Sequence, residues 1–298
     1  MTYNRVNPIS SMFFSVFIID VTINRQRKER GMDQKKTRKT EKRQLEIVRQ
    51  LRPIDDCFFE VMMEDPDACE ELLQVVLENP LLRIKKETVS GQKSIRIIGK
   101  RSIRVDAYAE GNEDTVFNIE IQRADNENHV KRVRYNASVI TVNRSEPGDL
   151  FEQVQELFVI YIADFDVLHN GRTISHAKMT CVETGVALND GLHEIFVTTV
   201  GKDNSKIARL MREYKNPDMN NPDFPKQSKR VQEMKHDSKE AEKMCSLVEE
   251  YAKEKVIQEA IESAVEFDRP KEETIARLIK KFGLTEEKAQ EYYDMFAK

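Results

Sequence analysis

Hydrophobic and polar residues alternate most clearly over residues 104–122, RVDAYAEGNEDTVFNIEIQ. This period-two pattern on both sides of a polar turn predicts two short antiparallel strands. If the turn centres on Glu113, Asp106 lies directly across from Glu120, with about 5 Å between the Cβ atoms. Two carboxylates at this distance repel each other, so a divalent metal ion is the natural occupant of the space between them. The alternative is a solvent-facing hairpin, and a one-residue slip in register would separate the two acids.

Helical patterns flank this hairpin. Apolar residues at helical spacing predict helices within 55–78 and over 128–143. Residues 84–90 and 94–99 are candidate strands, and the continuous apolar run LFVIYI at 157–162 predicts a strand that is covered on both faces. The order of helix, three or four strands, helix and strand predicts an α/β or α+β fold with one principal sheet.

Turn signals between short β-like segments in residues 167–200 predict a β extension of that sheet. Three helices are predicted towards the C-terminus, over residues 238–267, 274–282 and 285–296. The last two could be a DNA-binding helix-turn-helix. Residues 271–298 contain six basic and six acidic side chains, however, and this balance favours helix packing or self-association.

These patterns divide the chain into four parts. We expect a basic N-terminal extension over residues 1–52 that is disordered or partly helical, a main domain over 53–214, a linker over 215–237 and a helical C-terminal region over 238–298. Residues 1–31 differ in character from the rest, and we expect them to be an upstream extension of the reading frame. They lack the small-residue cleavage pattern of a signal peptide.

Charge and cysteine content narrow the class of protein. The net charge is −4, and no apolar run approaches the roughly 20 residues of a membrane span. Four widely separated cysteines without a CxxC pair favour reduced thiols in a cytoplasmic protein. Basic residues concentrate just before the hairpin, where they could neutralise a phosphate backbone. They are Arg83, Lys85, Lys86, Lys93, Arg96, Lys100, Arg101 and Arg104, against the single acid Glu87.

Four stretches occur in an order that is similar to a known family. They are DDCFFEVMMED, VDAYAEGNEDTVFNIEIQ, NHVKRVRYNASVI and VIYIADFDVLHNGRTISHAKMTCVETGVALNDGLHEIFV, together covering roughly residues 55–200. This series resembles the PD-(D/E)XK nuclease superfamily and, within it, the Rpn-like PD-(D/E)XK nuclease family transposases. The resemblance implies a restriction-endonuclease-like αβββαβ core with a mixed sheet, a β extension and a helical C-terminal region.

The resemblance also implies a site. Asp106, Glu120 and Gln122 would be the catalytic residues, and Asp106, Glu120 and the backbone carbonyl of Ile121 would bind Mg²⁺ or Mn²⁺. Gln122 stands where the superfamily usually carries Lys. Its neutral amide could orient a water molecule or a phosphate, but it contributes no positive charge.

Further residues could support this site. The superfamily tends to place an acid from its first helix near the metal, which makes Glu60 and Glu71 candidates, although each could equally be an exposed helix acid. Arg132 and Tyr135 match the Arg/Tyr helix of the family and could face the site, although Tyr135 could equally pack in the core. Of the basic residues, those nearest to the hairpin are expected to contact the DNA backbone: Lys100, Arg101 and Arg104.

The function implied is a metal-dependent DNA endonuclease associated with transposition or recombination. A DNA-binding or assembly protein that keeps the fold and has lost turnover is the alternative. A third hypothesis is an interaction protein that forms homo-oligomers through its C-terminal helices.

Overall fold

The computed structural model describes residues 34–95, 103–112, 114–126 and 128–297. The predictions for residues 1–31, Lys100 and Arg101 lie outside these ranges. The chain forms two compact units. Residues 47–241 form a unit built on a β-sheet, and residues 242–298 belong with the chain up to Glu46 in a unit whose described part is helical.

The sheet unit contains a mixed five-stranded sheet with the strand order β3-β4-β5-β7-β6. The central strands β4, β5 and β7 are parallel, and the edge strands β3 and β6 are antiparallel to their neighbours. This mixed sheet confirms the predicted α/β fold. The strands are β3 (Ala107–Glu110), β4 (Val116–Gln122), β5 (Leu157–Ala163), β6 (Ile174–Ala177) and β7 (Leu192–Thr198).

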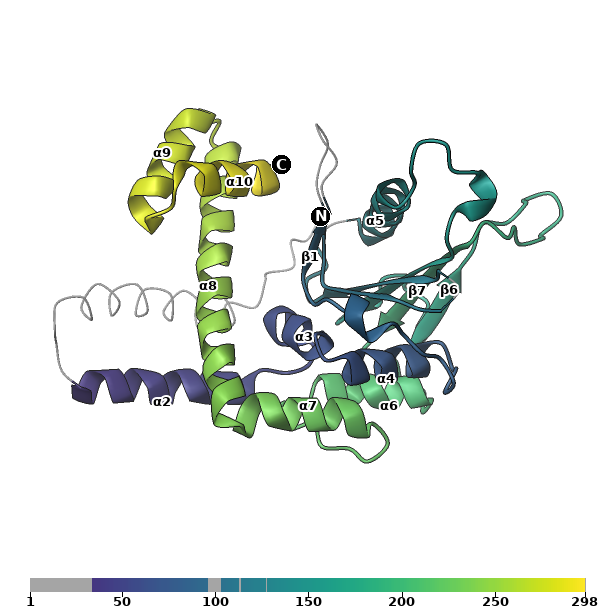
Figure 1. Ribbon diagram of the computed structural model, residues 1–298, viewed down its shortest axis with the longest axis horizontal. Helices are drawn as coiled ribbons and strands as arrows, with labels where there is room; N and C mark the ends of the chain where they lie inside the picture. The colour runs from purple at the N-terminus through teal and green to yellow at the C-terminus, as the bar shows by residue number, and fades with distance from the viewer. Residues whose placement is uncertain (1–33, 96–102, 113, 127, 298) are drawn as a thin grey trace. The chain divides into compact units, whose positions relative to one another are not determined.

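Helices cover both faces of the sheet (Figure 1). Helix α5 (His129–Asn143) packs on one face, where Val133, Ala137 and Ile140 share a hydrophobic cluster with alternate residues of β5. The helices on the other face are α3 (Asp56–Met63), α4 (Pro66–Val76), α6 (Lys206–Tyr214) and α7 (Pro225–His236). Because both faces are covered, β5 reads as an unbroken apolar run.

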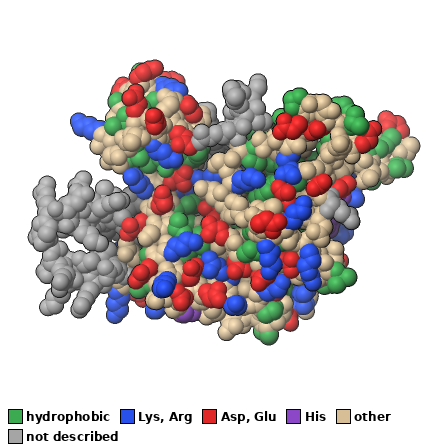
Figure 2. All heavy atoms as spheres, viewed as in Figure 1, with side chains coloured by type: hydrophobic (Ala, Val, Ile, Leu, Met, Phe, Trp, Pro, Cys, Tyr) green, Lys and Arg blue, Asp and Glu red, His purple; other side chains and the backbone are tan. Residues whose placement is uncertain are grey.

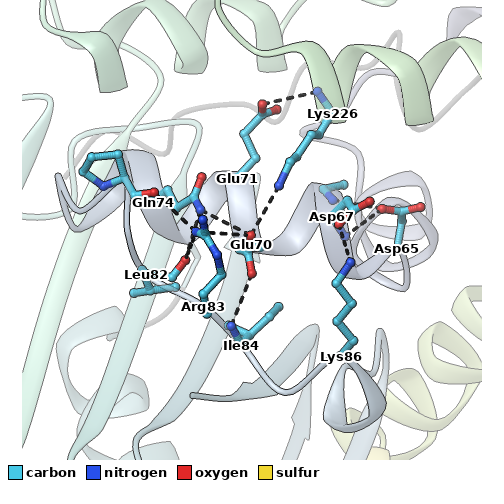
Figure 3. A network of polar contacts seen from close by, with 12 residues as sticks. Asp65, Asp67, Glu70, Glu71, Gln74, Leu82, Arg83, Ile84, Lys86 and Lys226 are labelled. Atoms are coloured by element: carbon cyan, nitrogen blue, oxygen red, sulfur yellow. Dashed lines mark hydrogen bonds and ion pairs between the residues drawn. The ribbon is translucent and has the colours of Figure 1, made fainter. Parts of the chain in front are cut away.

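The segment 215–237, expected to be a linker, contains α7 and belongs to the sheet unit. Its N-cap residue, Phe224, makes no capping hydrogen bond through its side chain. The cap comes instead from α4, where the buried Glu71 carboxylate accepts the backbone N–H of Lys226 at 3.2 Å (Figure 3). The same carboxylate accepts the backbone N–H of Gln227 at 2.8 Å. The neighbouring Glu70 contacts the Lys226 ammonium at 3.3 Å. A cap supplied from a distant helix leaves no local sequence signal.

Lys235 fixes the other end of α7. Its side chain is 2% exposed, and its ammonium group donates to the backbone carbonyls of Arg49 at 2.8 Å, Leu51 at 2.6 Å and Pro217. These carbonyls belong to the end of α2 (Gln34–Gln50) and to the loop before α7. One buried cation therefore ties three parts of the unit together.

The strands before the hairpin differ from expectation. Residues 84–90 contain the short 3₁₀ helix η1 (Lys86–Thr88) and two isolated bridges, not a strand. β1 (Lys93–Ile95) pairs with β2 (Ile103–Val105) in a separate two-stranded ribbon. The residues predicted as one strand before the turn are therefore split between two sheets.

The helical unit has its own core. Three helices follow α7, as the sequence predicts: α8 (Ser238–Glu266), α9 (Lys271–Phe282) and α10 (Glu286–Phe296). Their buried core residues are Ile257, Ile261, Leu278, Ala289 and Phe296. Gly283 ends α9 with φ +64°, a conformation that glycine adopts without the steric cost of a side chain. Of the helices described, none is both long and apolar enough to span a bilayer.

Candidate active site

The β3–β4 hairpin has the register that brings the two predicted acids together. Ala107 pairs with Ile119, Tyr108 with Asn118, and Ala109 with Phe117. This is the register that the sequence predicts, and the ladder ends at Ala107 and Ile119, the neighbours of Asp106 and Glu120 along the chain. Glu120 lies on the sheet face that α5 covers, since it alternates along β4 from Val116, a member of the hydrophobic cluster under α5.

Asp106 occupies the point where the chain passes from the ribbon into the main sheet. It follows β2 and precedes β3, and its Oδ2 accepts the backbone N–H of Ile121 at 2.8 Å. The ladder between β3 and β4 ends at the pair of Ala107 and Ile119. The N–H and C=O groups of one strand residue point to the same edge, so the Ile121 carbonyl points towards Asp106. This is the arrangement that the predicted backbone ligand requires.

Glu120 is fully buried in the middle of the sheet. Within the described part of the chain, neither of its carboxylate oxygens has a hydrogen-bond partner. Arg132 of α5 lies 3.6 Å from Glu120 Oε2, measured from Nη2, and its Nη1 donates to Gln122 Oε1 at 3.3 Å. Arg132 thus contacts both the second acid and the residue that replaces the usual Lys.

Burial and mutual repulsion perturb both carboxylates. Burial, followed by the charge of Asp106, raises the pKa of Glu120 to about 8, while Arg132 acts in the opposite direction. Burial also raises the pKa of Asp106 to about 6, and the hydrogen bond from Ile121 opposes this shift. These raised pKa values indicate that the surrounding protein supplies too little positive charge to neutralise both carboxylates.

Helix α3 brings further acids to this pair. Burial and the charge of Asp106 raise the pKa of Glu60 to about 8, and Asp56 in turn raises the pKa of Asp106. Of the two first-helix candidates, Glu60 therefore lies in the electrostatic field of the site. Glu71 does not join it, because its carboxylate caps α7. Asp56 was not predicted; its position one helical turn before Glu60 is the signal that could have identified it.

A polar contact anchors α5 against the sheet. His129 Nδ1 lies 2.8 Å from the hydroxyl of Tyr161, and Nε2 lies 3.1 Å from Asp125 Oδ1. Tyr161 is the β5 partner of Glu120, so this contact fixes the start of α5 beside the second acid. Arg132 follows one turn later. His129 therefore positions α5 against the sheet through these two contacts.

A family model for PD-(D/E)XK nuclease family transposases matches residues 58–280, about three quarters of the chain. The chain belongs to this family. No curated protein and no solved structure gave a match. The matched range extends beyond residues 55–200, where the sequence resemblance lies, and includes α8 and most of α9.

The residues present fit the divalent metal that PD-(D/E)XK nucleases typically use. The described ranges contain no group of three or more His, Cys, Asp or Glu side chains placed to hold a metal ion. The available donors are two carboxylates and a backbone carbonyl, all oxygen atoms, which suit Mg²⁺ or Mn²⁺. The unpartnered oxygens of buried Glu120 are the groups that a cation would satisfy.

The basic residues before the hairpin divide into two groups. Arg104 lies in β2 near the site, since its charge lowers the pKa of both Glu60 and Asp106. Others form ion pairs within the protein: Arg83 with Glu70, Lys85 with Asp114, and Lys86 with Asp67. On the face seen in Figure 2, positive and negative side chains are interspersed. The expected basic band is therefore partly neutralised by the protein's own acids.

The predicted Tyr135 lies at the surface of α5 with 36% of its area exposed. It therefore differs from Arg132 on the same helix, which reaches the buried carboxylate. Its predicted role facing the site stays a prediction.

Proposed function

We propose that this member of the PD-(D/E)XK nuclease family transposases is a metal-dependent DNA endonuclease. It hydrolyses phosphodiester bonds during transposition or recombination. The observation that carries the proposal is the position of Asp106 at the point where the ribbon joins the sheet, hydrogen-bonded to Ile121 next to Glu120, with the Glu120 oxygens buried and without a hydrogen bond in the described structure. A solvated hairpin, the alternative for this stretch, would not bury a carboxylate in this way.

In this proposal Asp106, Glu120 and the Ile121 carbonyl hold Mg²⁺ or Mn²⁺. The ion supplies Lewis acidity, which activates a water molecule and stabilises negative charge on the scissile phosphate. Glu60 would contribute a further carboxylate from α3, and Arg104, whose charge acts on both Glu60 and Asp106, would hold a phosphate next to the reacting one.

Arg132 and Gln122 together take the place of the usual Lys. The Gln122 amide can orient a water molecule or a phosphate oxygen, and the Arg132 guanidinium supplies the positive charge that Gln122 lacks. A guanidinium stays protonated, so this pair can stabilise an anion but cannot accept a proton. The protein therefore needs another group or solvent to take the proton from the attacking water.

Cleavage of supercoiled and linear DNA in Mg²⁺ or Mn²⁺ tests the proposal. Asp106→Ala and Glu120→Ala should each abolish cleavage. Asp114→Asn, an exposed change in the turn of the same hairpin, should leave it intact. Cleavage that survives loss of either acid would refute the assignment.

The neutral Gln122 favours a second candidate, a DNA-binding or assembly protein without turnover. Gel-shift measurements in Ca²⁺ distinguish the two candidates. DNA binding that persists in Asp106→Ala and Glu120→Ala, with no cleavage by the wild type, would support the second. Self-association through α8–α10 stays a prediction, which sedimentation of the full chain tests. A cytoplasmic location also stays a prediction, and cell fractionation tests it.

A further inference from the structure

Asn118 is an unusual residue for its place in β4. It is fully buried, pairs with Tyr108 of β3 and Val159 of β5, and both partners belong to the apolar cluster under α5. In the described structure neither its amide nitrogen nor its amide oxygen has a hydrogen-bond partner. Burying an amide without partners destabilises a fold, so this position calls for an explanation beyond packing.

The explanation lies two residues along the strand. Asn118 and Glu120 share a face of β4, so four buried polar atoms without a hydrogen bond in the described structure lie next to each other. Asn136 of α5 approaches the same carboxylate from the helix and is 4% exposed. It lies one helical turn beyond Arg132, and so on the same side of α5.

We infer that Asn118 and Asn136 are positioning residues that hold Glu120 for metal binding. This inference rests on the proposed function, because it requires Glu120 to be a metal ligand. A cation held between Asp106 and Glu120 engages one oxygen of the Glu120 carboxylate. The other oxygen then remains as a buried acceptor, and an Asn amide supplies the donor that it needs. Partners of this kind orient metal-binding carboxylates.

Replacement by Leu separates this role from a structural one. Leu branches at the same carbon as Asn and removes the unsatisfied amide, so Asn118→Leu should keep or raise the melting temperature. If the amide positions Glu120, the same change should weaken Mn²⁺ binding by about 10- to 100-fold. Asn136→Leu should weaken it in the same range. Asn143→Leu, an exposed change towards the end of α5, is the matched control and should leave binding unchanged.

Mn²⁺ binding is measured by electron paramagnetic resonance and calorimetry on the full chain, with Glu120→Gln as the reference for a lost ligand. If Glu120→Gln abolishes binding while both Leu variants bind as tightly as the wild type, the inference fails and the proposed metal site stands. If the wild type binds no Mn²⁺, or Glu120→Gln binds as well as the wild type, the proposed site itself fails. Should Asn118→Leu not fold, Asn136→Leu decides alone.

Discussion

Replacing Glu120 by Gln should stabilise the protein at neutral pH when no divalent cation is present. Most substitutions of a fully buried residue destabilise, so this expectation is specific to the site. Glu120 is buried beside Asp106, and both burial and repulsion penalise its ionised form. Gln keeps the shape of the side chain and carries no charge.

The size of the effect follows from the pKa of Glu120, which is raised from an ordinary 4.5 to about 8. Between these values the folded state holds a proton that the unfolded state has released, so the free energy of unfolding falls as the pH rises. From about pH 5 to about pH 7 this group alone should lower it by about 2–3 kcal/mol. Glu120→Gln should lack that decrease, and its advantage over the wild type should grow with pH.

Urea unfolding in EDTA measures this difference. Pulse labelling of Cys57 and Cys69, both buried in the sheet unit, reports the unfolding of that unit specifically. Saturating Mg²⁺ should stabilise the wild type, by about 1.4 kcal/mol at ten times its Kd, and should not stabilise Glu120→Gln. If the free energy of unfolding depends on pH equally in the two proteins in EDTA, the claim that the environment of Glu120 disfavours its ionised form is refuted.

Four further changes probe the site and the helices that support it. Mn²⁺ affinity should rise as the pH is raised from about 6 to about 8, because Asp106 and Glu120 must lose protons to bind a cation. Calorimetry in buffers of different ionisation enthalpy should detect the protons released, and an affinity that does not depend on pH would contradict this. Glu71→Ala should lower the free energy of unfolding by about 1–3 kcal/mol and leave Mn²⁺ affinity unchanged, whereas Glu60→Gln should weaken Mn²⁺ binding. Lys235→Met should cost about 1–3 kcal/mol in urea unfolding, since three backbone carbonyls lose their donor; an unchanged midpoint would show that water replaces it.

The sequence predicted the parts of the site that depend on local pattern. Strand alternation and the position of the turn gave the register of the ladder that ends next to Asp106 and Glu120, because side-chain direction in a hairpin follows from register alone. The covered strand β5 and the helix α5 were likewise evident from an apolar run and from helical spacing. Each of these signals lies within one element or one hairpin.

What the sequence missed depends on contacts between distant elements. Helix α7 begins with Pro225 after a segment rich in turn residues, and its cap is Glu71 from α4. The choice between Glu60 and Glu71 needed the same information, since both are acids on early helices. Asn118 reads in the sequence as an ordinary polar position of an alternating strand, and only its burial under α5 makes it exceptional.

The cap that Glu71 provides also has a consequence for synthesis on the ribosome. Glu71 and Lys226 are separated by 155 positions in the chain. At about 5–20 residues per second, α4 emerges about 8–30 s before the helix that it caps. Throughout that interval two glutamates destined for burial must remain hydrated, so the helices around α4 can close only late in translation. Proteolysis of ribosome-bound chains that stop before Pro225 or after Asp237 would show this as a gain of protection in the longer chain alone.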